Sequence, residues 1–75
     1  MTDTIMGMEL RFADHLFPDQ LMEGDIIKID NEFVTVKSFI QNDEGFNMCV
    51  LNDFDEEIDI FLWDDEKVEL YVFVE

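Results

Sequence analysis

The sequence predicts an all-β fold, a small antiparallel barrel of five to six short strands. Apolar residues recur at every second position, which is the period of strands with one buried face. The apolar segments are short and are separated by turn-forming residues. Eight Phe and a hydrophobic fraction of 48% distinguish the chain from a disordered acidic segment. At 75 residues, the chain is expected to form a single domain over residues 1–75.

The first strand is expected over residues 5–13, because apolar side chains there alternate with small or polar ones. The apolar members are Met6, Met8, Leu10 and Phe12. Residues 14–24 follow as a loop with one helical turn, since Pro18 and Gly24 interrupt regular structure. Leu21 is expected to close one end of the core.

The later strands are expected wherever alternation resumes between turn residues. They span residues 25–30, 32–41, 46–51, 57–63 and 68–74. Segment 55–67 also fits helical spacing, with acids in its first turn and Lys67 in its last. The alternating, β-prone run from Ile58 to Trp63 favours the strand.

The last two strands carry the candidate site. Their even residues form the predicted core set of Ile58, Ile60, Leu62, Val68, Leu70, Val72 and Val74. Their odd residues then point outward and make the predicted partner-binding set of Asp55, Glu57, Asp59, Phe61, Trp63, Glu69, Tyr71 and Phe73, with Glu75 beyond. If the two strands pair as a hairpin, four aromatic rings gather inside a rim of carboxylates. Protein-binding surfaces combine an aromatic centre with a polar rim in this way.

Two other interpretations of the same rings remain open. The strand at 5–13 could cover Phe61, Trp63, Tyr71 and Phe73, which would make them a second core layer. The rings could instead form the interface of a homodimer.

The charge balance limits the class of partner. Twenty Asp and Glu face four Lys and Arg, for a formal net charge of −16. Nucleic-acid binding depends on a basic surface, and anionic lipid would be repelled for the same reason. We therefore expect a basic protein partner, with no direct contact to nucleic acid or membrane.

Catalysis and cofactor binding are not expected. His15 and the single cysteine, Cys49, lie far apart in the sequence, and Cys49 lacks the electropositive setting of a reactive thiolate. Asp53, Asp55, Glu57 and Asp59 recur at strand spacing, which splays carboxylates and disfavours a metal site. The single cysteine, the absence of a signal peptide and the absence of a long apolar run predict a cytoplasmic protein.

The run from Leu21 to Val36 resembles the opening hairpin of SH3-like barrels. It is most similar to the KOW-like N-terminal domain of the bacterial elongation factor P family, in which a Gly introduces a strand and the next strand carries alternating Val. The matching positions are Gly24, Ile27, Ile29, Val34 and Val36. That family presents a basic tip with a functional lysine, whereas residues 41–45 here are acidic. The resemblance therefore implies the fold and not the translation role.

The leading hypothesis is a non-catalytic acidic module that docks a basic protein. In its sharpest form the module mimics nucleic acid and occupies the DNA or RNA site of its partner. Small acidic proteins of this type resemble phage-encoded inhibitors of host enzymes. The alternatives are a structural or assembly subunit, and a translation- or transcription-associated SH3-like domain.

Overall fold

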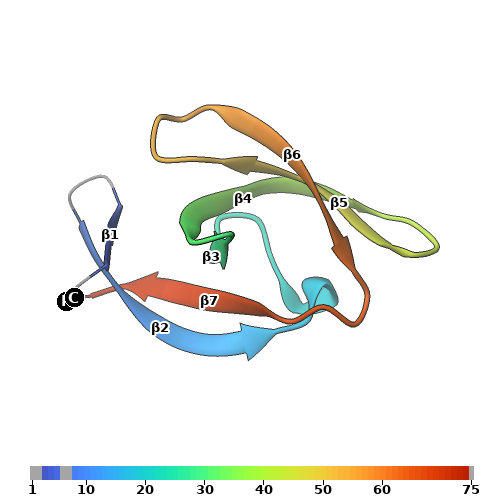
Figure 1. Cartoon of the computed structure of the whole chain (residues 1–75), viewed down its shortest axis with the longest axis horizontal. Helices are drawn as coiled ribbons and strands as arrows, with labels where there is room; N and C mark the ends of the chain where they lie inside the picture. The colour runs from blue at the N-terminus through green and yellow to red at the C-terminus, as the bar shows by residue number, and fades with distance from the viewer. Residues whose placement is uncertain (1–2, 6–7, 75) are drawn as a thin grey trace.

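Seven antiparallel strands form one curled sheet in the order β1-β2-β7-β3-β4-β5-β6 (Figure 1). The computed structural model describes residues 3–5 and 8–74. The strands are β1 (Asp3–Ile5), β2 (Met8–Leu16), β3 (Ile26–Ile29), β4 (Glu32–Gln41), β5 (Gly45–Leu51), β6 (Glu57–Trp63) and β7 (Val68–Phe73). A short 3-10 helix, η1 (Pro18–Gln20), follows β2. Within the described residues the end strands β1 and β6 do not pair with each other, so the sheet is curled but not closed.

The all-β prediction is confirmed, and the six expected strands correspond to β2–β7. The main correction is at the N-terminus, where the strand expected over residues 5–13 begins at Met8 and continues to Leu16. A register shift between Phe12 and Asp14 marks a bulge, which hides this continuation from a period-two pattern. Met6 lies outside the described residues. The segment at 55–67 contains strand β6 and not a helix.

Asparagine side chains and left-handed backbone shape the turns. Asp30 and Asn31 have φ of 50° and 67°, as a two-residue type I′ hairpin turn between β3 and β4 requires. Asn42 Oδ1 accepts hydrogen bonds from the backbone N–H of Glu44 and Gly45, at 3.0 and 2.9 Å. Asn52 Oδ1 does the same in the β5–β6 turn. These local bonds fix the hairpins that carry the candidate site.

The main core lies inside the curl of the sheet. Its buried members are Leu21, Ile27, Val34, Val36, Phe46, Met48, Val50, Leu62 and Val68. Ile58, Ile60 and Leu70 pack against it, so five of the seven predicted core residues of β6 and β7 are confirmed. The predicted core position of Val74 is wrong, because this residue is 45% exposed just beyond the end of β7. Val72 is half-buried and belongs to neither core cluster.

A second, smaller core lies on the opposite face of the sheet. Leu10, Ile26 and Tyr71 are buried there, and Phe33 packs against them. Ile26, Phe33 and Tyr71 each stand next to a residue that faces the main core, namely Ile27, Val34 and Leu70, as alternation along a strand requires. Strands β3, β4 and β7 therefore contribute apolar side chains to both faces.

Candidate functional site

The predicted binding site is divided in the structure. Strand β6 pairs with β5, whereas β7 pairs with β2 and β3. The predicted β6–β7 hairpin is therefore wrong, and three strands separate the two in the sheet. In its observed position β7 forms main-chain hydrogen bonds along both of its edges and places apolar side chains in both cores.

The β6 half of the predicted site is confirmed as an outward row. Glu57, Asp59, Phe61 and Trp63 are all exposed, and the residues between them face the core. Asp55 does not extend this row, because it lies in the β5–β6 turn with φ of 59°. The row therefore has two carboxylates followed by two aromatic rings.

The β7 half has a different environment. Tyr71 is buried in the second core, where its ring centroid lies 4.8 Å from that of Phe33 and 5.9 Å from that of Phe12. Its hydroxyl group donates to the Glu69 carboxylate at 3.4 Å. Phe73 remains 41% exposed at the end of β7. The second-core interpretation therefore holds for Tyr71. Strand β2 pairs with β7 within the sheet instead of covering the face of the sheet.

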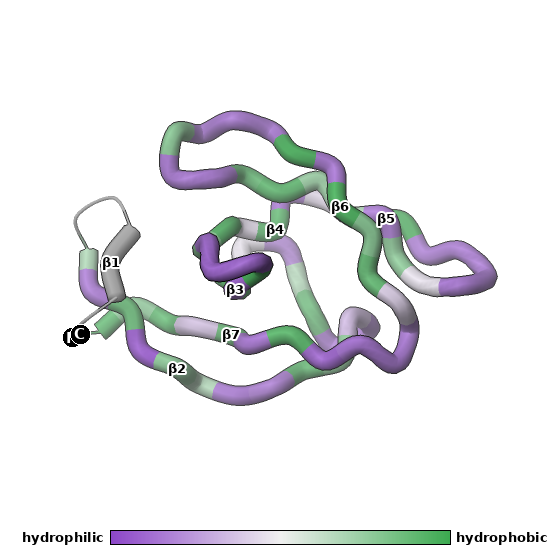
Figure 2. The backbone as a smooth tube through the Cα atoms, viewed as in Figure 1, coloured by the Kyte–Doolittle hydropathy of each residue, from purple (hydrophilic) through white to green (hydrophobic). Residues whose placement is uncertain are grey.

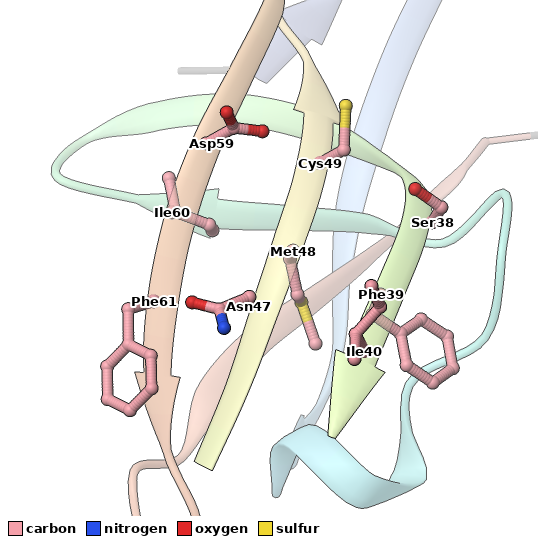
Figure 3. Close-up of a pocket in the computed structure, with 9 residues that line it drawn as sticks. All are labelled: Ser38, Phe39, Ile40, Asn47, Met48, Cys49, Asp59, Ile60 and Phe61. Atoms are coloured by element: carbon pink, nitrogen blue, oxygen red, sulfur yellow. The ribbon is translucent and has the colours of Figure 1, made fainter. Parts of the chain in front are cut away.

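Strands β4, β5 and β6 together present an outward surface, called here the β4–β6 outer face. Strand register aligns Ile40, Asn47 and Phe61 in one cross-strand row and Ser38, Cys49 and Asp59 in the next. Figure 3 shows both rows crossing the three strands. These residues, with parts of the strands between them, line an open hollow of about 480 Å³. The surface is therefore shallow and mixed in character, with no enclosed cleft.

Sequence reasoning missed Ile40, which is 73% exposed on this surface. The cause is a register shift between Val36 and Ser38, which reverses the alternation of β4. Phe39 then takes the inward side and Ile40 the outward side. Two adjacent apolar residues at this point were the only local sign of the reversal.

Phe61 and Trp63 form an aromatic pair on this surface. Their centroids are 4.9 Å apart and the rings meet edge to face at 88°. Phe61 is 37% exposed and Trp63 is 52% exposed. Such a pair is a rigid apolar anchor, because aromatic side chains lose little conformational freedom when they bind.

Acidic turns lie next to this pair. The β4–β5 and β6–β7 turns meet where the backbone N–H of Asp64 donates to the carbonyl of Glu44 at 3.3 Å. Figure 2 shows both turns as hydrophilic. Their carboxylate-bearing residues are Asp43, Glu44, Asp64, Asp65 and Glu66. Trp63 immediately precedes this cluster, so the apolar anchor lies at the margin of a strongly anionic region.

Few cations offset this charge. The ion pair in the described part of the chain joins Lys37 and Glu57, whose side chains are 51% and 56% exposed. Lys28 lies over the rings of Phe33 and Tyr71, and Lys67 lies over Phe17. Asp59 forms no ion pair in the described residues. An exposed ion pair contributes about 0–1 kcal/mol, so even Glu57 remains available to a partner.

Other kinds of site receive no added support. Within residues 8–74, no three His, Cys, Asp or Glu side chains group closely enough to hold a metal ion. No helix in the described part of the chain has the length and apolar character of a membrane span. Comparison of the sequence and structure with protein families, curated proteins and solved structures finds no match. The resemblance to the elongation factor P domain therefore stays a prediction.

Proposed function

We propose that this chain is a non-catalytic acidic module that docks a basic protein through the β4–β6 outer face. The observation that carries the proposal is the exposed Phe61–Trp63 pair beside carboxylates that have few cationic partners. Aromatic residues at the centre of an interface supply most of its affinity, while a charged rim speeds encounter and selects partners. With a net charge of −16, that rim selects cationic surfaces.

The sharper form of the proposal is nucleic-acid mimicry, as in a phage-type inhibitor. The longest dimension of the chain is 37 Å. A DNA duplex of that length carries about 22 phosphate charges, at one per about 1.7 Å of axis. A net charge of −16 over the same length approaches that density. A protein that binds nucleic acid electrostatically is therefore the class of partner that this charge favours.

The test is an affinity capture with matched variants. Wild-type protein, Phe61→Ser with Trp63→Ser, and Phe54→Ser are immobilised and exposed to a lysate at low salt. Phe54 is the control, because it is 82% exposed but lies in the β5–β6 turn, away from the aromatic pair. Wild type and Phe54→Ser should retain the same basic protein, and the double variant should lose it.

Two further measurements define the binding mode. About 0.5 M salt should release the captured protein, because the Debye length falls to a few ångströms. The half-buried thiol of Cys49 lies on the β4–β6 outer face, so the purified partner should slow its alkylation. Failure to capture a basic protein, or capture that the double variant leaves intact, would refute the proposal.

A further inference from the structure

The outer edge of β6 is open. β6 is the last strand of the sheet, and no strand among the described residues pairs with its second edge. It pairs with β5 along all seven of its residues without a register shift. At the end of β6 the Trp63 N–H donates to Glu66 Oε1 at 3.3 Å, and the Trp63 carbonyl accepts from the Glu66 N–H at 3.1 Å. Residues 57–62 therefore leave about 20 Å of regular backbone open, at about 3.3 Å per residue, with alternate N–H and C=O groups directed away from the sheet.

This edge lacks most of the features that normally prevent strand addition. Natural edge strands are protected by Pro, Lys, bulges, short length or inward-pointing charges. β6 contains no Pro or Lys, has no bulge, and directs apolar side chains inward. Its charged residues, Glu57 and Asp59, both face outward. They would repel an acidic strand and attract a basic one.

The inner side of the same edge is apolar and incompletely covered. Ile58 and Ile60 pack against the main core while remaining half-buried. Together with residues of β3, β4 and β5 they line a hollow of about 120 Å³, which Asp30 and Glu32 also border. A strand added to β6 would direct every second side chain toward this side. Short apolar side chains there would complete the burial of both isoleucines.

We propose that β6 accepts an extended segment of a cationic protein as an added antiparallel strand. The inference rests on the proposed function and specifies how the basic partner attaches. Main-chain hydrogen bonds to β6 would supply affinity, and alternate side chains would supply specificity, as in other cases of strand addition.

The order of outward residues on β6 defines the pattern of the added strand. Read in the antiparallel direction, its first outward residues face Trp63 and Phe61 and its last face Asp59 and Glu57. The segment should therefore carry an apolar residue or Arg at the first outward positions and Lys or Arg at the last. Arg opposite Phe61 would gain a cation–π contact in addition to its charge.

Charge complementarity distinguishes this occupant from a second copy of the chain. Antiparallel pairing of two β6 strands about Ile60 would place Glu57 opposite Trp63 and Asp59 opposite Phe61 of the other chain. Because β6 contains no Lys or Arg, neither carboxylate would gain a cationic partner in this pairing. Two chains that each carry a net charge of −16 would also be brought together. A cationic segment gains from the same field that opposes self-association.

The test uses a seven-residue synthetic peptide, Leu-Thr-Arg-Val-Lys-Val-Lys with blocked ends, matched to the seven residues of β6. Two derivatives carry N-methyl groups on the odd or on the even amides. In an antiparallel strand only one set of amides faces β6, so one derivative should bind at least about tenfold more weakly than the parent. The other should bind like the parent.

The site is checked on the full chain by amide hydrogen exchange and by charge reversal. Peptide binding should slow exchange of the β6 amides. Asp59→Lys should weaken binding about fivefold or more, because it reverses a charge opposite the peptide lysines. Asp43→Lys, which makes the same change of charge in the β4–β5 turn, should have a smaller effect.

The outcomes separate this inference from the proposed function. If both methylated peptides bind like the parent, strand addition is wrong and a basic partner binds through side chains alone. If no peptide binds but the capture experiment recovers a basic protein, strand addition is again wrong and the proposed function stands. If neither binds, both proposals fail. Protection of the β6 amides in a dimer before peptide is added would identify a second copy as the occupant and refute the inference.

Discussion

The rings of Phe61 and Trp63 meet edge to face, 4.9 Å apart, on the exposed side of β6. Tyr71, which the sequence pattern placed beside them, is buried in a second core on β7, and three strands lie between β7 and β6. The alternation of each strand places all three aromatic residues on the side away from the main core. Phe61 and Trp63 are exposed there and accessible to a partner, whereas Tyr71 is buried and stabilises the fold.

Substitution of these residues should separate the two roles. Trp63→Ala should lower the free energy of unfolding by about 1 kcal/mol or less, because half of the side chain is already in water. Tyr71→Ala should lower it by about 3–5 kcal/mol, because it leaves a cavity between Phe12 and Phe33. Urea denaturation followed by circular dichroism measures both. Equal losses for the two variants would contradict the assignment of roles.

Fluorescence quenching should report the local potential at the single Trp. Because Trp63 is 52% exposed and lies next to two turns that carry five acidic residues, its emission should be water-like and accessible to small quenchers. At low ionic strength the ratio of caesium to iodide quenching constants should be at least about twofold higher than for neutral N-acetyltryptophanamide, since the anionic field attracts the cation and repels the anion. Added salt should bring the two ratios together. A ratio equal to or below that of the free derivative would show that the field at Trp63 is not anionic.

Gly45 should be intolerant of a side chain. A Cβ atom at this position would overlap the carbonyl oxygen of Leu62 and lie 2.9 Å from the Cα of Trp63. Both atoms belong to the backbone of β6, so Gly45→Ala should destabilise the fold by about 1–3 kcal/mol through overpacking. Thermal unfolding measures the loss.

Gly24 provides the matched control for Gly45. A Cβ at Gly24 meets no atom within 4 Å, but the residue has φ of +93°. Gly24→Ala should therefore destabilise through backbone strain alone, by about 1 kcal/mol. If Gly45→Ala proved neutral, the close approach of β5 to β6 would be wrong.

Salt should stabilise the folded chain. Self-repulsion among carboxylates opposes compaction, and the exposed Lys37–Glu57 pair offsets little of it. Raising sodium chloride from about 20 mM to about 500 mM shortens the Debye length from about 20 Å to about 4 Å and should raise the stability. A gain of about 1 kcal/mol would raise the melting temperature by about 4–8 °C in a domain of this size. A melting temperature that falls with salt would contradict the prediction.

The accuracy of the sequence predictions depends on the range of the interactions involved. The face assignment of β6 was correct, because a regular alternation specifies which side chains face the core. The turns at Asn42 and Asn52 were also recognisable, since their hydrogen bonds are local. The bounds of β4 were also correct. The bulge near Ala13 disrupted the prediction for β2, and the bulge near Lys37 concealed the exposure of Ile40, because one extra residue reverses every later side chain.

The amino-acid pattern was sufficient to establish strand-rich structure, the outward row of β6 and an anionic exterior, since each follows from composition or from neighbours along the chain. Only the folded arrangement placed β7 between β2 and β3, buried Tyr71 and left the edge of β6 open. Alternation specifies the two faces of a strand but not its two edges. Main-chain hydrogen bonds at those edges are nearly the same for every residue, so the choice of neighbouring strand depends on how the whole core packs.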